Sequence, residues 1–170
     1  GRDATTGTTV TLHRESGGAQ NSVGVFAQDL IAVTPKLALT LSVRGDWWRT
    51  YDGHNLENSV PSGTPTANNA PTLPERTDSA VSPRLAALYH LTNRVSVWGS
   101  FGTGFRAPTL NELYRQFRVG TVLTLANNQL GPEHLVGGEM GVRIEAMRNL
   151  TVRSTWFDND FTNLIVINPT

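Results

Sequence analysis

The chain has 170 residues, no cysteine and a formal net charge of zero, and 38% of its residues are hydrophobic. The lack of cysteine excludes a disulfide scaffold and thiolate zinc sites, and the balanced charge gives no electrostatic basis for binding nucleic acid. No stretch approaches the roughly 20 apolar residues that a membrane-spanning helix needs. A membrane β-barrel stays open, because only every second residue of its wall must be apolar.

Period-two alternation of apolar and polar residues predicts an all-β chain of seven strands. In chain order the strands are expected at 6–13, 22–34, 37–50, 79–92, 94–105, 133–147 and 149–167. Several of these have 12 residues or more, whereas strands of globular proteins usually have about 5–6 and a tilted strand needs about 9–11 to cross a bilayer. The predicted strands are therefore long enough to span a membrane.

The predicted connections alternate between short and long. Tight turns are expected at 34–36, 92–94 and 147–149, and longer loops at 14–21, 51–78 and 106–132. In an up-and-down antiparallel sheet, all the short turns then lie at one end. Outer-membrane barrels have this asymmetry, with short periplasmic turns and long extracellular loops.

The alternation also separates charge from apolar side chains. Charged residues fall on one face of their strands: Arg44, Asp46, Arg84, Glu139, Arg143, Glu145 and Arg153. Apolar residues fall on the other face: Leu39, Leu41, Val43, Val95, Val97, Val142, Ile144, Leu150 and Val152. The first set is expected to face the lumen of a barrel and the second to face lipid, where a charge costs roughly 2–4 kcal/mol at mid-membrane. A soluble sheet with one face on a core would show the same pattern.

Aromatic residues gather near the predicted strand ends on the long-loop side: Trp47, Trp48, Tyr51, Phe101, Phe105, Trp156 and Phe157. They fit an aromatic girdle at a membrane interface, although aromatic residues also favour strands in general.

Residues 82–114 resemble the barrel of TonB-dependent outer-membrane receptors. The specific part contains Phe105-Arg106-Ala107-Pro108 followed by Asn111-Glu112-Leu113-Tyr114. The family usually continues with an Asn-Pro-x-Leu-x-Pro-Glu segment, which here is 127–133 with Asn128 in place of the proline. Weaker similarities lie at 26–29, 41–44, 139–141 and 156–165, so the resemblance covers nearly the whole chain.

The resemblance implies that residues 1–170 are the middle-to-late part of a 22-stranded barrel, roughly a third of it. The plug domain and the TonB box of such receptors are not expected within this sequence. The implied function is TonB-energised uptake of a scarce ligand such as a ferric siderophore, cobalamin or a sugar across the outer membrane of a Gram-negative bacterium. The implied partners are outer-membrane lipid, the plug, the TonB system and the extracellular ligand. A passive porin-like or structural barrel, and a soluble β-sandwich acting as a binding module, lectin or enzyme, are the alternatives.

Candidate ligand contacts are the aromatic and basic residues in or beside the long loops: Trp48, Tyr51, His54, Tyr114, Arg115 and Arg118. Aromatic faces and arginine forks suit a planar anionic chelate. Arg106 and Glu112 are expected to face the lumen or plug, and we favour a structural pair between them at the barrel rim over direct ligand contact.

No catalytic residue or cofactor site is predicted. The four histidines, His13, His54, His90 and His134, lack metal-ligand spacing. The segment from Asp158 to Asp160 lacks the glycine and glutamate of a calcium loop, and a solvated strand end is favoured there. The glycine-rich run 99–104 has no following lysine and no helix context, which argues against a phosphate-binding loop.

Overall fold

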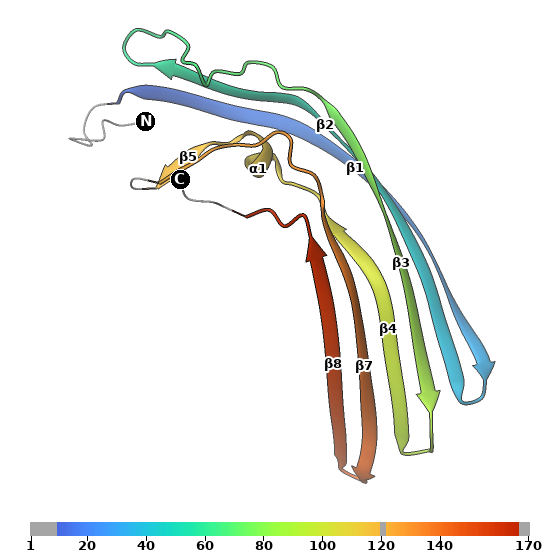
Figure 1. The fold of residues 1–170 in the computed structure, drawn as a ribbon. Helices are drawn as coiled ribbons and strands as arrows, with labels where there is room; N and C mark the ends of the chain where they lie inside the picture. Colours follow the sequence, from blue (N-terminus) through green and yellow to red (C-terminus); the bar gives the residue numbers. More distant parts are fainter. Residues whose placement is uncertain (1–9, 120–121, 167–170) are drawn as a thin grey trace.

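The computed structural model describes residues 10–119 and 122–166. At 117–119 and 122–123 it describes the backbone alone. Six strands form one curved antiparallel sheet in the order β1-β2-β3-β4-β7-β8 (Figure 1). Their bounds are β1 Leu12–Thr34, β2 Leu37–Ser59, β3 Arg76–His90, β4 Val95–Arg106, β7 Glu133–Met147 and β8 Leu150–Thr162. The connection from β4 to β7 holds the short helix α1 (Leu110–Tyr114) and a small hairpin of β5 (Phe117–Val119) and β6 (Val122–Thr124).

The predicted up-and-down topology is confirmed, because each strand of the large sheet pairs with its neighbour in the chain. The three tight turns lie together at one end of the sheet, and the long connections lie at the other end (Figure 1). In the described ranges no helix is long and apolar enough to cross a membrane.

The number and length of the strands differ from the prediction. The loop expected at 14–21 is wrong, since these residues belong to β1, which joins the two strands expected at 6–13 and 22–34. Residues 6–9 lie outside the described part of the chain. Gly17 and Gly18 lie within this range, at a register shift where β1 follows a bulge in β2.

The two other long connections are partly ordered into regular elements. β2 continues to Ser59, well beyond its predicted end, and β3 begins at Arg76. Residues 106–132 contain α1, β5 and β6. The large sheet therefore has six strands rather than seven, and β8 ends at Thr162 within the range predicted for the last strand.

Strand register places the predicted apolar and charged sets on opposite faces. Directly opposed residues of paired strands share a face, and Leu39 lies in one such row with Ala87, Gly99, Met140 and Trp156. The neighbouring row on the other face contains Thr40, Ala86, Ser100, Glu139 and Phe157. We call the face that carries the charged rows the inner face, because it is the concave side on which α1 lies (Figure 1), and the opposite face the outer face.

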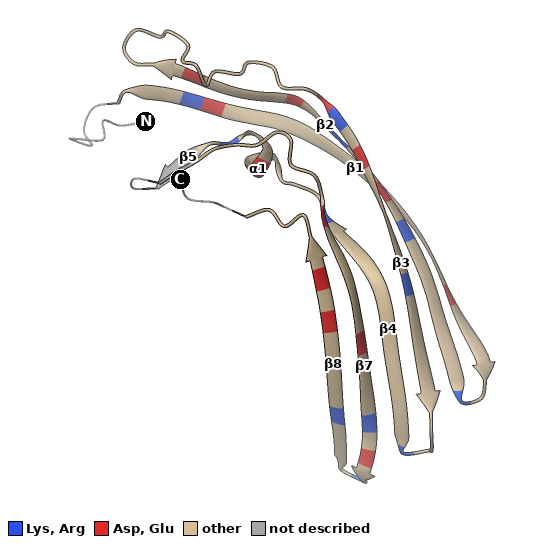
Figure 2. Cartoon of the chain, in the orientation of Figure 1, with Lys and Arg blue, Asp and Glu red and all other residues tan. Residues whose placement is uncertain are grey.

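The outer face is apolar over most of the sheet, and its charged residues lie mainly toward the long-loop end, where Glu15 and Arg49 belong to it. Asp29 lies in one row with Leu41, and Asp158 and Asp160 lie near the end of β8. The inner face mixes charged and aromatic residues, and Figure 2 shows where along the strands the charged residues lie. About 9–11 residues counted from each turn suffice to cross a bilayer. At 23 residues each, β1 and β2 run well beyond that length, and the connection between β4 and β7 begins beyond it as well.

Candidate functional site

The inner face of β2 is buried in its upper part. Trp48 and Thr50 are almost fully covered, and after them the buried positions shift to Gly53, Asn55 and Glu57. The shift occurs at Asp52, whose φ of 54° marks a bulge. Since every second residue is covered, one face of the strand packs against another segment, and that segment begins with α1.

Local sequence explains why α1 forms where it does. Thr109 is its N-cap and accepts a hydrogen bond from the Glu112 backbone, while the Glu112 side chain accepts one from the Thr109 backbone. This capping box satisfies two backbone donors that the first turn would otherwise leave free. The helix buries Leu113 and Tyr114 against the strands.

Tyr114 fits into a notch made by two glycines, one on each of β1 and β2. A Cβ atom at Gly18 or at Gly53 would lie 2.6 Å from the Tyr114 ring, closer than atoms can approach. Only glycine lets the ring come this near to both strands. Tyr114 is 2% exposed, and burial raises the pKa of its phenol. We call Gly18, Gly53 and Tyr114 the glycine notch.

A buried carboxylate ties four segments together beside the notch. Glu57 of β2 accepts hydrogen bonds from the Gln116 amide at 2.6 Å, the Thr66 hydroxyl at 2.7 Å and the Asn68 amide at 3.2 Å. It also forms an ion pair with Arg14 of β1. Burial alone would raise the pKa of Glu57, but the bonds from Thr66, Arg14 and Asn68 outweigh it and lower the pKa. We call these residues the Glu57 cluster.

A second cluster closes the base of the connection from β4 to β7. The Arg106 guanidinium donates to both oxygens of Glu133, at 2.6 and 2.9 Å, and to Glu112 at 3.1 Å. Glu133 also accepts the Ile165 backbone N–H at 2.7 Å. Hydrogen bonding from Arg106, and then from Ile165, lowers the pKa of Glu133 to about 2. Arg106 thus holds both ends of the connection and the N-terminal part of α1 in one arrangement.

The edge of β4 turns inward above Gly102. Pairing of β4 with β3 ends at Gly102, whereas its pairing with β7 continues to Arg106. Phe105, which by alternation belongs to the outer set of β4, stacks on Trp48 of the inner face with ring centroids 5.1 Å apart. Two of the aromatic residues assigned to the girdle are therefore used for packing inside the curve of the sheet.

Lower on the sheet, the charged residues of the inner face form ion pairs. Arg84 contacts Glu139 at 3.2 Å, Arg44 contacts Asp46 at 2.7 Å, and Arg143 of β7 contacts Glu145 at 2.8 Å. Arg153 lies directly opposite Arg143. A groove of about 340 Å³ on this face is lined by Arg84, Glu139, Phe157 and Asn159 around glycines.

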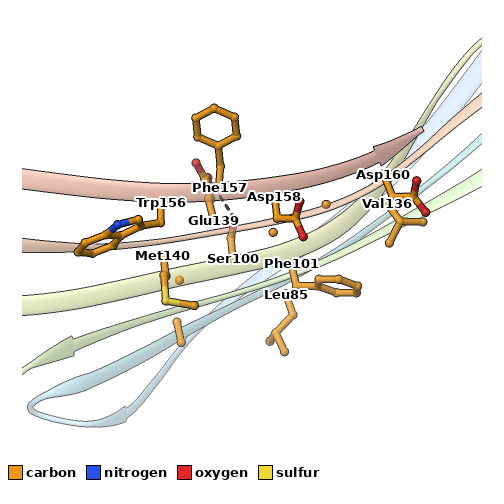
Figure 3. Close-up of a pocket in the computed structure, with 14 residues that line it drawn as sticks. Leu85, Ser100, Phe101, Val136, Glu139, Met140, Trp156, Phe157, Asp158 and Asp160 are labelled. Atoms are coloured by element: carbon orange, nitrogen blue, oxygen red, sulfur yellow. Dashed lines mark hydrogen bonds between the residues drawn. The ribbon is translucent and has the colours of Figure 1, made fainter.

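A larger groove, of about 700 Å³, lies mainly on the outer face between β3 and β8. Its apolar wall is made by Leu85, Phe101, Met140 and Trp156, and Glu139 and Phe157 point to the opposite side (Figure 3). The sequence predicts that the outer face meets lipid, so this groove is not the place to expect a water-soluble ligand.

The structure divides the six residues predicted to contact ligand. Trp48 and Tyr114 lie on the inner face and are 5% and 2% exposed, so both are engaged in packing. Tyr51 and His54 fall on the other face of β2 and are half-buried, with the Arg49 guanidinium above the Tyr51 ring. Arg115 is exposed directly after α1, and Arg118 lies in β5, where only the backbone is described.

Several residues of the site were not predicted from the sequence. Glu57 and Arg14 fall within predicted loops, and Gly18, Gly53 and Gln116 belong to no motif in the sequence. One signal in the sequence could have revealed them. Small or polar residues recur at every second position, at Gly53, Asn55 and Glu57, and they continue the inner face of β2 beyond the bulge at Asp52. In the described residues, no three His, Asp or Glu side chains are grouped so that they could hold a metal ion.

Comparison with known proteins decides the family. The sequence profile of the TonB-dependent receptor-like β-barrel matches residues 2–170. The chain belongs to the TonB-dependent receptor β-barrel family. Members of this family are transporters rather than enzymes, and they reside in the outer membrane of Gram-negative bacteria. No curated protein matches the sequence significantly.

Among solved structures, this chain is similar in fold to the copper transporter OprC, with a TM-score of 0.62 and 16% sequence identity. The match covers 81% of this chain but 20% of OprC. At this identity the likeness concerns the fold, and the chain spans about a fifth of that transporter's length.

Proposed function

We propose that the protein is part of an outer-membrane receptor that imports a scarce small ligand with energy supplied through TonB. The observation that supports this proposal most strongly is the match of residues 2–170 to the receptor barrel family. The family also implies a plug domain inside the barrel, TonB as the energy-coupling partner, and a small ligand taken up from outside.

The segment from Arg106 to Glu133 is proposed to contribute to the ligand site. It leaves the sheet at the end of β4, packs α1 on the inner face at the glycine notch and returns at the start of β7. Loops of this length in a compact protein are usually functional or disordered, and this one is held by two polar clusters and a buried aromatic ring. Rigid support of this kind favours a precise binding site, because less freedom is lost when the ligand binds.

Arg115 and Arg118 are the ligand contacts that we propose first. Both follow α1 in the segment from Arg106 to Glu133, and Arg115 is exposed. A guanidinium can hold a carboxylate or a catecholate-type anion through two parallel hydrogen bonds. Trp48 and Tyr114 then act by supporting the segment, while Tyr51 and His54 are the weaker candidates because they lie on the other face of β2.

A ferric siderophore is the ligand class that we propose, because two neighbouring guanidinium groups suit an anionic chelate. The structural likeness to a copper transporter makes copper ion the main competing cargo. Uptake of ferric siderophores, copper ion, cobalamin and a sugar should be compared in cells carrying the full-length protein, with and without a functional TonB system. We expect uptake of a ferric siderophore that stops when TonB is absent.

Uptake that continues without TonB would instead indicate a passive channel, and TonB-dependent uptake of copper alone would replace the proposed ligand class. Ligand binding by Arg115→Gln and Arg118→Gln variants tests the contacts. Arg49→Gln is the matched control, since Arg49 is exposed at the same end of the sheet but lies on the outer face. Equal affinity in all three variants would remove the two arginines from the site.

A further inference from the structure

The three tight turns of the sheet each carry one basic residue and no acidic residue. Lys36 lies between β1 and β2, Arg94 between β3 and β4, and Arg148 between β7 and β8. The whole chain contains 14 basic and 14 acidic residues, so a purely basic set of turns departs from the balanced composition. We call these three residues the basic rim.

Backbone hydrogen bonds hold neighbouring turns side by side. The His90 N–H donates to the Lys36 carbonyl at 2.8 Å, and the Glu145 N–H donates to the Arg94 carbonyl at 2.8 Å. The first bond joins the β1–β2 turn to β3, and the second joins the β3–β4 turn to β7. The basic rim therefore follows one end of the sheet as a row, as the blue positions at the lower ends of the strands indicate (Figure 2).

The basic rim differs from most other basic residues of the described chain in having no acidic partner. Ion pairs engage Arg14, Arg44, Arg49, Arg76, Arg84, Arg106 and Arg143. In the same part of the chain, none of the ion pairs includes Lys36, Arg94 or Arg148. The acidic residue closest to the rim along the strands, Glu145, is bonded to Arg143 at 2.8 Å. Three cations are thus left free at this end.

The position of the basic rim corresponds to one edge of the apolar outer face. The outer face begins directly beside the turns with Leu37, Tyr89, Val95 and Leu150. Tyrosine at this level is typical of a membrane interface, where the ring meets acyl chains and the hydroxyl meets the headgroups. Short turns of outer-membrane barrels lie on the periplasmic side. The free cations therefore lie at the level of the periplasmic headgroups.

We propose that the basic rim is a binding surface for the phosphate groups of anionic phospholipids in the periplasmic leaflet. An ammonium or guanidinium group on a flexible stem can reach a neighbouring phosphate and form a charge-assisted hydrogen bond. Each basic residue near an anionic membrane surface adds a favourable interaction that salt weakens. The row anchors the turn end of the wall, and it does so independently of the ligand that the receptor carries.

The test uses the full-length protein reconstituted into nanodiscs of phosphatidylethanolamine with and without phosphatidylglycerol. Native mass spectrometry of the protein released from the discs measures how many phosphatidylglycerol molecules it retains. The variant combines Lys36→Gln, Arg94→Gln and Arg148→Gln. We expect this variant to retain at most about a tenth of the phosphatidylglycerol that the unmodified protein retains. It should show no preference for phosphatidylglycerol over phosphatidylethanolamine.

The control variant combines Arg49→Gln, Arg115→Gln and Arg153→Gln, which removes the same net charge from the far end and the inner face. It should retain phosphatidylglycerol as the unmodified protein does. Equal losses in the two variants would show that net charge alone sets retention, and unchanged retention in the rim variant would show that the turns do not bind lipid. Either outcome overturns the proposal. Circular dichroism and heat-modifiable migration on gels confirm that both variants are assembled.

Discussion

At the scale of single residues, the fit of Tyr114 into the glycine notch should depend on the absence of a methyl group. Gly18→Ala places its Cβ 2.6 Å from the ring, so the ring must move. Overpacking of this kind costs about 1–3 kcal/mol. We expect amide hydrogens of residues 110–116 to exchange about tenfold faster or more in the full-length protein, as measured by mass spectrometry.

Gly131→Ala is the matched control, because apart from its neighbours in the chain no residue comes within 4 Å of the added Cβ. Tyr114→Phe should also keep the slow exchange, since the ring rather than the hydroxyl fills the notch. Similar exchange in Gly18→Ala and Gly131→Ala would mean that the notch does not hold α1.

Glu57 should make the attachment of the long loop between β2 and β3 depend on pH. Its pKa is lowered in the folded protein, because hydrogen bonds from Thr66, Arg14 and Asn68 outweigh the effect of burial. A lowered carboxyl pKa contributes stability above the pKa of the unfolded chain, and that contribution is lost as pH falls through the folded value. The loop should therefore loosen only in acid, below the ordinary pKa of about 4.3 for glutamate.

A spin label at Ser62→Cys, in a chain with no other cysteine, reports this motion by electron paramagnetic resonance. Label mobility should rise as pH falls below 4.3, the value at which an ordinary glutamate is half protonated. In Glu57→Gln the label should be mobile at every pH tested. A label that is equally restrained at neutral and acid pH would contradict the role of the ionised carboxylate.

At the scale of strands, the two faces of β2 should tolerate charge differently. Leu41→Arg places a cation on the outer face, where the cost at mid-membrane is about 2–4 kcal/mol. Thr40→Arg is the control, because Thr40 lies on the inner face in one row with Glu139. We expect Leu41→Arg to reduce the amount of assembled protein in outer-membrane fractions several-fold and Thr40→Arg to leave it nearly unchanged. Equal amounts would mean that the assignment of the faces is wrong.

Because β1 and β2 are longer than predicted, residues 14–21 should tolerate an insertion less well than the exposed turn after β2. An epitope tag inserted between Gln20 and Asn21 interrupts the β1–β2 ladder, whereas a tag between Ser62 and Gly63 enters an exposed turn. Only the second insertion should permit normal assembly and antibody binding on intact cells. Tolerance of both insertions would show that residues 14–21 are a loop after all.

The sequence was informative where alternation was strict and where turns were tight. The range 133–147 agrees with β7, and all three turns lie where Pro35, Asn93 and Asn149 interrupt the pattern. Prediction failed at 14–21 and 51–59, because glycines and a bulge in a strand resemble loop residues until their partner strand is known. The site could not be derived for the same reason, since Glu57, Gln116 and Arg14 meet only through long-range packing.

At the scale of the whole molecule, β1 and β8 are the two open edges of the described sheet. Unpaired backbone groups are not tolerated in lipid, so closure of the wall requires further strands. The 170-residue chain expressed alone should therefore aggregate or remain dependent on detergent. Size-exclusion chromatography and thermal unfolding test this expectation, and a soluble monomer with one cooperative transition would contradict the membrane assignment.

The neighbour-to-neighbour pairing of the strands has a consequence for how such receptors diversify. Because each connection joins adjacent strands, a change in its length does not alter which strands pair. The entropy of closing a flexible loop grows slowly, by about 0.6 kcal/mol for each doubling of its length. Outside the residues held by the Glu57 cluster and the glycine notch, the connections from β2 to β3 and from β4 to β7 can therefore change in length at little cost to the wall, which lets the surface above the barrel vary while the barrel itself stays the same.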